Sequence, residues 1–545
     1  MPIKVLEDQL ISKIAAGEVV ERPVSVVKEL LENSLDANAT QVNVEVQGGG
    51  TNLIRVSDNG NGIPYDEVEL AFQRHATSKI DRLADLESIT TLGFRGEALP
   101  SIKSVADVEI LTKADDDITG TFLQYRDSKI AVREKRSRPR GTTITVRQLF
   151  RNFPARLKFL KSPATENGHI ANLITQYALA YPEVRFSLII DSRTTLQTAG
   201  NGNLRDVIAE IYGMEIATTL LNVDKTNDLP IITGLVSPPS LSRSSRDYIS
   251  FFVNRRWVRS SLLARAALDA YKGSLMTGKY PFVILSIAFP PQEIDVNVHP
   301  TKAEVKFRYS QSIYTAVARA IENALARAPL PRFKTPMAET TPSSLWTMEG
   351  FDIASLPILR VVGQLSGTYI MAEGPSGLYL IDQHAAHERI LFEKVLEQHS
   401  EKKMDIQGLL EPLTIELNPK QEEVFIQKSE LLVDFGFSLE HFGGHSYILR
   451  ALPAMLKNGN PSEALQNLLD SLETNNDAAK REETIAQSLA CHSAIRAGEA
   501  LTHEEMREMV RQLEGTKKPR TCPHGRPTMI HISSHQLERE FGRTG

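Results

Sequence analysis

Hydrophobic and polar positions follow regular periods over two long stretches of this chain, with an aperiodic stretch between them. Residues 24–37 repeat apolar positions at helical spacing, and Pro23 stands in the first turn, where a helix tolerates proline. A later helix is predicted over residues 311–326. Alternating apolar and polar residues predict strands over residues 41–46, 52–57, 248–253 and 294–298. Helices and strands therefore mix within one N-terminal block.

The periodic pattern stops at residues 329–357, which hold four prolines before Pro357 and little apolar repetition. This composition is typical of a flexible linker, whose mean span at this length is about 30 Å. Beyond it, residues 361–365 and 377–382 again have the pattern of strands. The predicted organisation is a long N-terminal α/β block, a tether and a shorter C-terminal block.

Composition narrows the class of protein. The chain has 545 residues, 41% hydrophobic and 24% charged, which predicts a globular protein of about three or four domains. No apolar run reaches the ~18–20 residues of a membrane span, and the N-terminus lacks the apolar stretch of a signal peptide, so no membrane contact is expected. Two cysteines exclude a disulfide framework and favour a cytoplasmic location. A net charge of −5 still leaves room for a local basic groove.

The first predicted helix carries a candidate catalytic face. Glu29, Asn33 and Asp36 are four and three residues apart, so they lie on one side of the helix. A carboxylate with an amide one turn further on can place a water and a Mg²⁺ ion beside a phosphate, with Glu29 as general base and Asn33 as metal ligand. Taken alone, the segment is more often a solvated helix face.

Glycine-containing turns supply the other parts of a candidate nucleotide pocket. Asp58 at a strand end can accept a hydrogen bond from an adenine amino group, and Gly62 lets the backbone approach the ring, although alone this is an ordinary turn. Gly93 and Gly96 precede a helix and offer N–H groups to phosphate oxygens. Thr142 lies among small residues that open a strand, where they can form the pocket floor.

In this order and spacing, the segments resemble the ATP-binding fold shared by DNA gyrase B subunits, heat-shock chaperones, histidine kinases and the MutL mismatch-repair proteins. The resemblance to MutL proteins is the closest, and it continues after the linker, so it covers nearly the whole chain. It is carried by Pro23-Val-Ser-Val-Val-Lys-Glu-Leu-Leu-Glu-Asn-Ser-Leu-Asp-Ala37, Arg74-His-Ala-Thr-Ser-Lys79, Gly93-Phe-Arg-Gly-Glu-Ala-Leu99, Phe252-Val-Asn-Arg-Arg-Trp257 and Asp295-Val-Asn-Val-His-Pro-Thr-Lys302.

The resemblance implies an α+β multidomain fold. An N-terminal ATPase α/β sandwich of the gyrase, chaperone and kinase type is expected over residues 1–210, and a second α/β domain of ribosomal-protein-like fold over 211–328. The linker at 329–357 then leads to an α/β dimerisation and endonuclease domain at 358–545. Within that domain, an inserted regulatory subdomain is expected at about 413–485.

The same resemblance implies roles for individual residues with ATP and Mg²⁺. Glu29 would activate the hydrolytic water, Asn33 would bind Mg²⁺ and Asp58 would recognise adenine. Lys302 would reach the γ-phosphate from the second domain, so that hydrolysis is coupled to domain movement. The other implied nucleotide contacts are Gly62, Thr77, Thr142 and the phosphate-covering lid residues Gly93, Phe94, Arg95 and Gly96.

The C-terminal block carries a candidate metal site. The run Asp382-Gln-His384-Ala-Ala-His-Glu388-Arg-Ile-Leu-Phe-Glu393 matches the pattern of those family members that cut DNA. His384 and Glu388 are one helical turn apart and can both face one ion, with Asp382 just before the helix. Glu393 is expected to orient the ligands rather than to bind, and His387 to lie on another face of the helix.

Far along the chain, Cys522 and His524 are two residues apart, a spacing at which one turn can bring both to a metal. With Asp382, His384 and Glu388 they form a mixed hard and soft ligand set, which predicts one tightly held Zn²⁺-like ion and a labile Mn²⁺ or Mg²⁺. Such ions assist phosphodiester hydrolysis by lowering the pKa of a bound water. Cys491 and the terminal residues 541–543 also lie in segments that resemble the nuclease-type proteins.

Three further signals concern partners. Gln407, Leu410 and Pro412 match the peptide that docks on the bacterial replication sliding clamp, a pattern short enough to arise by chance. A basic run at residues 133–140 can contact DNA phosphates without reading sequence, although a solvated loop is nearly as plausible. Arg259 matches an arginine that the family resemblance associates with DNA.

Taken together, these features predict a mismatch-repair homodimer that is switched by ATP, recruited by a MutS-type mismatch sensor, aimed by the sliding clamp and able to nick double-stranded DNA without sequence preference. The main alternative is an ATP-dependent matchmaker without nuclease activity, whose C-terminal metal site is structural. A type II topoisomerase would need a cleavage tyrosine after residue 329, a chaperone gives no reason for the clamp peptide, and a histidine kinase would need phosphoacceptor helices ahead of the ATPase.

Overall fold

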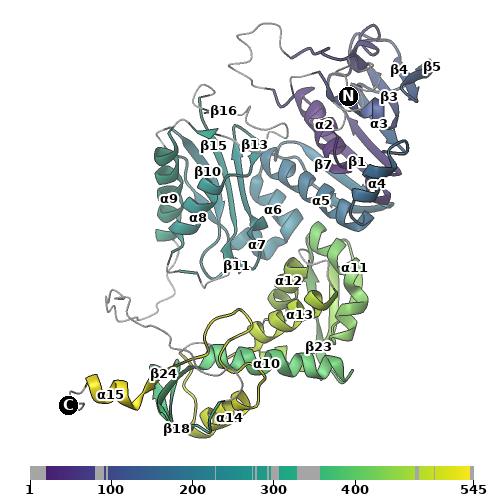
Figure 1. The fold of residues 1–545 in the computed structure, drawn as a ribbon. Coiled ribbons are helices and arrows are strands. Elements are labelled where there is room, and N and C mark those ends of the chain that lie inside the picture. Colours follow the sequence, from purple (N-terminus) through teal and green to yellow (C-terminus); the bar gives the residue numbers. More distant parts are fainter. Residues whose placement is uncertain are drawn as a thin grey trace, which may run out of the picture. The chain divides into compact units, whose positions relative to one another are not determined.

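The computed structural model divides into two compact units, one formed mainly by residues 1–329 and the other mainly by residues 330–545 (Figure 1). The structure describes residues 20–79, 91–93, 96–226, 229–272, 274–275, 279–290, 294–295, 306–307, 309–327, 356–458, 460–472, 478–495 and 498–540. Almost all of the predicted linker at 329–357 lies outside the described residues, as do Phe94, Arg95, Lys302 and the terminal segment 541–543.

The N-terminal unit begins with an eight-stranded sheet in the order β5-β4-β3-β6-β2-β1-β7-β8. Its strands are β1 (Gln41–Gln47), β2 (Leu53–Asp58), β3 (Asp107–Lys113), β4 (Gly120–Arg126), β5 (Lys129–Arg136), β6 (Gly141–Arg147), β7 (Arg185–Ile190) and β8 (Arg193–Gln197). β1 pairs with β7 in parallel, whereas β1 pairs with β2, and β2 with β6, in antiparallel fashion. Alternate residues of β1 and β3 are buried, which is the signature of a sheet covered on one face.

Helices cover that buried face. They are α2 (Pro23–Asp36), α3 (Ala98–Val105) and α5 (Pro163–Ala180). α2 places Val26, Val27, Leu30 and Leu31 in the shared core, because these positions repeat at helical spacing. Pro23 is in the first turn of α2, as predicted, where its missing N–H costs no hydrogen bond. The result is the predicted α/β sandwich.

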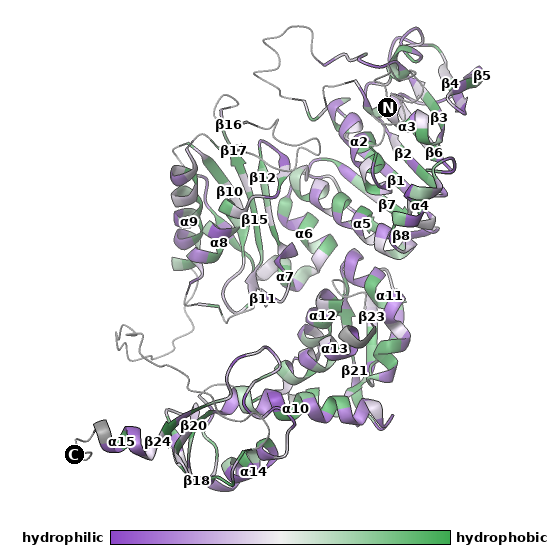
Figure 2. Cartoon of the chain, viewed as in Figure 1, coloured by the Kyte–Doolittle hydropathy of each residue, from purple (hydrophilic) through white to green (hydrophobic). Residues whose placement is uncertain are grey.

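A second sheet with the order β13-β12-β15-β10-β9 has its own hydrophobic core. Its strands are β9 (Leu221–Val223), β10 (Ile231–Val236), β12 (Ile249–Val253), β13 (Arg256–Val258) and β15 (Val283–Ala288), and it is accompanied by α6 (Leu204–Tyr212), α7 (Met214–Thr219), α8 (Ser261–Ala270) and α9 (Ser310–Ala326). The predictions of a strand at 248–253 and a helix at 311–326 are confirmed. β10 and β15 are mostly hydrophobic, whereas α9 alternates between hydrophobic and hydrophilic residues (Figure 2).

The remaining short strands of this unit are β11 (Ser242–Arg243), β14 (Tyr280–Pro281), β16 (Ile294–Asp295) and β17 (Lys306–Phe307). β16 is the described part of the strand predicted over 294–298, and residues 296–300 lie outside the description.

The C-terminal unit is built on a four-stranded sheet, β18-β19-β20-β24. Its strands are β18 (Arg360–Leu365), β19 (Tyr369–Gly374), β20 (Gly377–Asp382) and β24 (Met529–Ser533). The chain leaves β20 and enters α10 (Gln383–Ser400) without a loop, so the strand end positions the start of the helix. Three further helices of this unit are α13 (Ala478–Ser493), α14 (His503–Glu514) and α15 (Ser534–Glu540).

A smaller three-stranded sheet, β21-β23-β22, follows α10 in the chain. It consists of β21 (Ile406–Glu416), β22 (Ser438–Gly443) and β23 (Ser446–Pro453), with α11 (Pro419–Asp434) and α12 (Pro461–Leu472) between and after the strands. This segment overlaps the predicted inserted subdomain, but its first strand begins at Ile406 rather than at about residue 413. Among the described residues, no helix has the length and apolar character needed to cross a bilayer.

Candidate functional sites

A cavity of about 1150 Å³ opens beside α2 in the N-terminal unit. The predicted nucleotide-binding residues that line it are Glu29, Asn33, Asp58, Gly62, Thr77, Gly93, Gly96 and Thr142. These residues come from a helix, two strand ends and three loop segments that are distant in sequence. The structure therefore brings together every predicted contact of this pocket that lies among the described residues.

Asp58 ends β2 with its carboxylate held in a fixed orientation. Its Oδ1 accepts hydrogen bonds from the backbone N–H groups of Gly60 at 2.9 Å and Thr142 at 3.1 Å, and its Oδ2 accepts one from the Ser34 hydroxyl at 2.9 Å. Burial raises the pKa of the Asp58 carboxyl above its usual value, against the lowering effect of these hydrogen bonds. Because each carboxylate oxygen has two lone pairs, Oδ2 retains one acceptor position for a ligand.

Two turns that line the cavity pack against neighbouring backbone more closely than a side chain would permit. Gly62 has φ +72°, and a Cβ there would lie 2.1 Å from the carbonyl oxygen of Lys113. Gly96 has φ +63°, and a Cβ there would lie 2.5 Å from the carbonyl oxygen of Ala76. Only glycine fits both the backbone angle and the space at these positions.

Asn33 and Asp36 on α2 both accept hydrogen bonds from a lysine side chain. The Lys79 ammonium donates to Asn33 Oδ1 at 2.9 Å and to Asp36 Oδ2 at 2.5 Å. The same Asp36 carboxylate accepts the backbone N–H groups of Leu92 at 2.9 Å and Gly93 at 3.0 Å. One helix face therefore offers an oxygen-rich place for positive charge and anchors the start of the predicted lid.

The second domain contacts this lid segment through a residue that the sequence did not single out. The Arg256 guanidinium, on β13, donates a hydrogen bond to the backbone carbonyl of Thr91, two residues before Gly93. The Thr91 hydroxyl in turn donates to the Gly93 carbonyl at 2.9 Å. Arg256 lies in the Phe252–Trp257 string that carried the family resemblance, but nothing in that string indicated which arginine contacts the lid segment.

Part of the basic run at residues 133–140 also turns out to be structural. The Arg138 guanidinium donates to the backbone carbonyls of Leu111 and Asp58, and Arg140 Nε donates to the Gly60 carbonyl at 3.1 Å. These two side chains brace the strand ends that carry Asp58. Neither interpretation of the basic run included this role, in which guanidinium groups donate to main-chain carbonyl groups.

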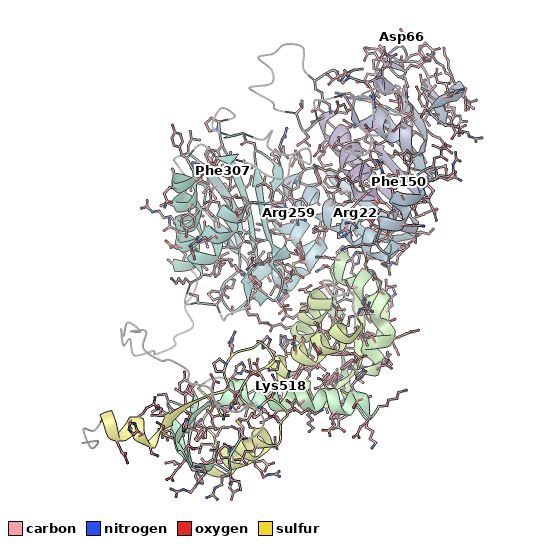
Figure 3. All side chains as sticks on the ribbon, in the orientation of Figure 1. Arg22, Asp66, Phe150, Arg259, Phe307 and Lys518 are labelled. Atoms are coloured by element: carbon pink, nitrogen blue, oxygen red, sulfur yellow. The ribbon has the colours of Figure 1, made fainter. Side chains whose placement is uncertain are left out.

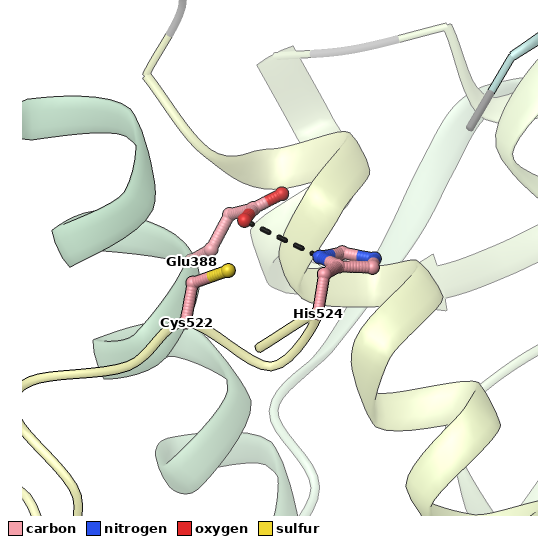
Figure 4. Close-up of side chains that lie close together, drawn as sticks. All are labelled: Glu388, Cys522 and His524. Carbon is pink, nitrogen blue, oxygen red and sulfur yellow. Dashed lines mark ion pairs between the residues drawn. The ribbon is translucent and has the colours of Figure 1, made fainter. Parts of the chain in front are cut away.

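In the C-terminal unit, Glu388, Cys522 and His524 converge (Figure 4). One ligand atom from each lies within 4.8 Å of the others. Glu388 comes from α10, whereas Cys522 and His524 come from a turn more than a hundred residues further along the chain. The backbone N–H of Cys522 donates to the Arg526 carbonyl at 2.8 Å, and the N–H of Gly525 to the Cys522 carbonyl at 2.9 Å, which closes that turn.

Electrostatics couple these three groups. Hydrogen bonds first to Cys522 and then to Glu388 raise the pKa of His524 to about 9. Burial raises the pKa of Cys522, but hydrogen bonds from His524 and from backbone N–H groups outweigh it, so the pKa of this thiol is lowered overall. Burial likewise raises the pKa of Glu388, and the hydrogen bonds with His384 and His524 lower it well below its usual range. Both pKa shifts are toward the deprotonated forms of Cys522 and Glu388, which are the forms that bind metals.

Two other predicted ligands stand next to this group. His384 Nε2 is 3.4 Å from Glu388 Oε1, and its Nδ1 is 2.9 Å from the Ile495 carbonyl. A carbonyl partner requires a proton on Nδ1, which leaves Nε2 as the nitrogen that faces Glu388. Asp382 is at the helix N-cap instead, where its Oδ1 accepts the Ala385 N–H at 3.0 Å, and it is not within the converged group.

The expectation that His387 lies on another face of α10 is wrong. His387 is three residues after His384, which places both on one side of the helix, and its Nδ1 accepts the backbone N–H of Ile495 at 3.0 Å, the residue whose carbonyl His384 contacts. Glu393 accepts the backbone N–H groups of Lys517 at 2.7 Å and Lys518 at 3.2 Å. Neither side chain belongs to the converged group.

The partner motifs are at the surface. Gln407, Leu410 and Pro412 are exposed on β21, and the Leu410 side chain is fully exposed at 100%. Arg259 is exposed after β13 (Figure 3). Its guanidinium lies 5.0 Å from the centre of the Trp257 ring. Cys491 is half-buried at the end of α13.

Three segments of the chain match known families. Residues 21–149 match the histidine kinase-, DNA gyrase B- and HSP90-like ATPases, residues 208–326 the C-terminal domain of DNA mismatch repair proteins, and residues 362–501 the MutL C-terminal dimerisation domain. The N-terminal fold and its cavity thus define an ATPase of the gyrase, chaperone and histidine kinase class. A crystal structure of the N-terminal domain of a DNA repair protein shares this fold, at 29% identity and a TM-score of 0.51, over 58% of this chain and 98% of that one.

Similarity to whole proteins narrows the class to one family. The chain is 38% identical to the DNA mismatch repair protein MutL of Pelotomaculum thermopropionicum over 604 residues, covering 99% of this chain and 100% of that protein. It is 40% identical to MutL of Dictyoglomus turgidum over 570 residues, covering 99% of each. The chain belongs to the MutL family of DNA mismatch repair proteins.

Proposed function

We propose that this MutL-family chain is an ATP-switched homodimer that nicks duplex DNA at a metal site of its own. The observation that carries the proposal is the convergence of Glu388, Cys522 and His524 from two distant segments. Two of these three groups are buried, and together a thiol, a carboxyl and an imidazole form a donor set that a metal ion can bind.

The donor set fits a metal ion. A thiolate, a carboxylate and an imidazole are the usual ligands of Zn²⁺. Glu388, Cys522 and His524 would hold the ion, and His384 would join them through Nε2, which its carbonyl partner leaves available. Asp382, a carboxylate at the start of α10 and outside the converged group, would hold a more labile Mn²⁺ or Mg²⁺. When bound, such ions lower the pKa of water and neutralise charge on a phosphodiester.

The N-terminal cavity would supply the switch. Asp58 would accept the adenine amino group, Asn33 would bind Mg²⁺ in the place where the Lys79 ammonium now lies, and Glu29 would take the proton of the attacking water. Gly93 to Gly96 would cover the phosphates, and Lys302 would reach the γ-phosphate from the second domain. The Arg256 contact with Thr91 supports this coupling between the second domain and the lid.

The sheet of the C-terminal unit offers a surface for the homodimer. Met371, Leu380 and Ile530 are cross-strand neighbours on one face of β19, β20 and β24, and Ile530 is 57% exposed. Replacing Ile530 by Asp is expected to reduce the molar mass in light scattering to that of one chain. As a control, Met214→Asp changes a similarly exposed residue of the N-terminal unit and should leave the dimer intact. A dimeric Ile530→Asp protein would contradict the assignment of this surface.

Recruitment would follow the family pattern, through a MutS-type sensor and the sliding clamp. A fully exposed Leu410 in the clamp motif supports the second contact, because an apolar side chain in water gains the most by docking. Arg259 and the exposed cations of β5 would contact double-stranded DNA through its phosphates.

The decisive experiment is incubation of the purified protein with supercoiled plasmid and Mn²⁺, beside an Asp382→Asn variant. Asn caps a helix as well as Asp does, so this variant keeps the Ala385 hydrogen bond and removes only the negative charge. Nicked circles from the wild type and none from the variant are expected. Equal nicking by both proteins would mean that the activity is a contaminant or that Asp382 has no part in it.

A structural metal remains the second candidate, because Asp382 is engaged as a helix cap outside the converged group. In that case neither protein would nick the plasmid, even with ATP and the clamp present, while both would bind zinc and hydrolyse ATP. The chain would then be a matchmaker without nuclease activity.

A further inference from the structure

A basic loop leads into the candidate metal centre, and metal binding does not explain its charge. No Asp or Glu occurs between residues 515 and 537, whereas Lys517, Lys518, Arg520 and Arg526 lie in the first half of that stretch. The Lys517 and Lys518 side chains are exposed, and Figure 3 labels Lys518 on this unit. An acid-free stretch with four cations concentrates positive charge at one place on a chain that is acidic overall.

The backbone of this loop is tied to α10. Glu393 accepts the N–H of Lys517 with one carboxylate oxygen and the N–H of Lys518 with the other, at 2.7 and 3.2 Å. One turn earlier on the helix, Arg389 Nε donates to the Thr521 carbonyl at 2.5 Å, and the Arg389 guanidinium pairs with Glu393 at 3.6 Å. The helix therefore holds the loop by its main chain, and the two lysine side chains are not what fixes it.

The same loop continues directly into the metal ligands. Cys522 follows Lys518 by four residues, and its closed turn brings His524 to Glu388. Since Glu388 and Glu393 are both on α10, one helix positions the converged group and the lysine pair together. Each lysine carries its charge on a flexible four-carbon stem, so two neighbouring lysines can reach successive phosphates of one strand.

We propose that Lys517 and Lys518 bind backbone phosphates of the DNA strand next to the bond that is cut, and that Glu393 is a positioning residue that holds this phosphate-binding loop. The assignment rests on the proposed nuclease function of the same site. Phosphate contacts of this kind fix the register of the substrate without reading its sequence, which suits an enzyme that must nick any sequence.

The test uses the full-length protein with both lysines replaced, Lys517→Ala with Lys518→Ala, against a matched control with Lys402→Ala and Lys403→Ala. The control lysines are also adjacent and exposed, and lie beyond the other end of α10, roughly 20 Å along the helix from Glu388. In plasmid nicking with Mn²⁺, the loop variant should raise KM with little change in kcat. Its slope of log kcat/KM against log salt should be shallower by about 2, since each phosphate contact contributes roughly 0.9.

The loss of kcat/KM caused by the substitutions should shrink about 12- to 16-fold between 50 and 200 mM salt, as a slope difference of about 1.8–2 requires. The control should retain the wild-type KM and slope. An unchanged KM and slope in the loop variant, with the wild type nicking normally, would overturn the proposal.

Glu393 is tested by a double-mutant cycle on preparations of equal zinc content. Glu393→Ala alone should raise KM as the lysine pair does, because the loop loses the two backbone hydrogen bonds that hold Lys517 and Lys518. Added to the lysine pair, it should raise KM little further, since both changes act through the same contact. Additive effects, or a fall in kcat alone, would show that Glu393 does not act through this loop.

A readout independent of cleavage separates this inference from the nuclease proposal. Acetylation of exposed lysines, mapped by mass spectrometry with and without duplex DNA, should show protection of Lys517 and Lys518 and none of Lys402 and Lys403. Protection without nicking would preserve the phosphate-binding loop and refute the nuclease. Nicking without protection would preserve the nuclease and refute the loop assignment.

Discussion

Substitutions at Asp58 in the N-terminal cavity can distinguish an effect on ATP binding from an effect on folding, because the two carboxylate oxygens have different partners. Oδ1 accepts both backbone N–H groups, of Gly60 and Thr142, whereas Oδ2 accepts only the Ser34 hydroxyl. In Asp58→Asn, the amide oxygen can keep both backbone bonds. The new NH₂ can donate to Ser34 Oγ, whose own proton already has the Leu30 carbonyl as an acceptor at 3.1 Å.

The magnitudes follow from this accounting. Asp58→Asn leaves no buried donor without an acceptor, so we expect it to change the free energy of unfolding by less than about 1 kcal/mol. Its effect on ATP should be large, because an acceptor for the adenine amino group becomes a donor. A hydrogen bond to a charged group contributes about 1.5–3 kcal/mol, equivalent to a loss of affinity of about 10- to 150-fold.

Asp58→Ala gives the contrast. It strands the two backbone N–H groups of Gly60 and Thr142 in a buried site, at about 1–3 kcal/mol each. A total of about 2–6 kcal/mol is a large part of the 5–15 kcal/mol by which a domain is stable. We therefore expect the Ala variant to unfold at markedly lower temperature and the Asn variant to melt close to the wild type.

The assay is titration with a fluorescent ATP analogue, paired with thermal unfolding of each variant. Wild-type affinity for ATP in a well-folded Asp58→Asn protein would refute the adenine assignment. A strongly destabilised Asp58→Asn protein would refute the hydrogen-bond accounting.

Three further predictions concern other parts of the chain. Gly62→Ala forces a Cβ to within 2.1 Å of the Lys113 carbonyl at a positive φ, so it should destabilise the N-terminal unit by about 1–3 kcal/mol in denaturant unfolding, and an unchanged midpoint would contradict the geometry. Arg256→Ala removes the contact with Thr91 and should slow ATP hydrolysis without weakening the first binding of ATP, and equal turnover would show that the contact is incidental. Leu410→Ala alters a fully exposed side chain, so melting should not change while binding to the sliding clamp in surface plasmon resonance falls at least tenfold, and retained binding would exclude the motif.

Local sequence patterns predicted the secondary structure near the sites well. The α2 helix, the β1 and β2 strands and α9 all begin and end within about two residues of their expected positions, because each has an unbroken period and a clear breaker at its end. The short strand β16 shows the limit, since too little of it is described to test the prediction over 294–298.

At the candidate sites, some groupings of residues follow from the sequence and others appear only in the structure. Glu29, Asn33 and Asp36 could be grouped from sequence because a helix determines which side chains share a face. The Arg256 contact with Thr91 joins residues 165 positions apart, and no local rule indicates it. The bracing roles of Arg138 and Arg140 were likewise hidden, because a cation in a basic run has the same local pattern whether it meets a phosphate or a backbone carbonyl.

By itself the sequence determined the family, the order of the domains and the residue types that can bind ATP and a metal, since motifs of short range carry that information. Tertiary structure alone decided which groups meet. It brought Cys522 and His524 to Glu388, made Asp382 a helix cap, and gave the Glu393 carboxylate to the backbone of Lys517 and Lys518. The physical reason is that hydrogen bonds and metal sites depend on distances of a few ångströms between atoms, and residues far apart in the chain reach such distances only when the hydrophobic cores pack.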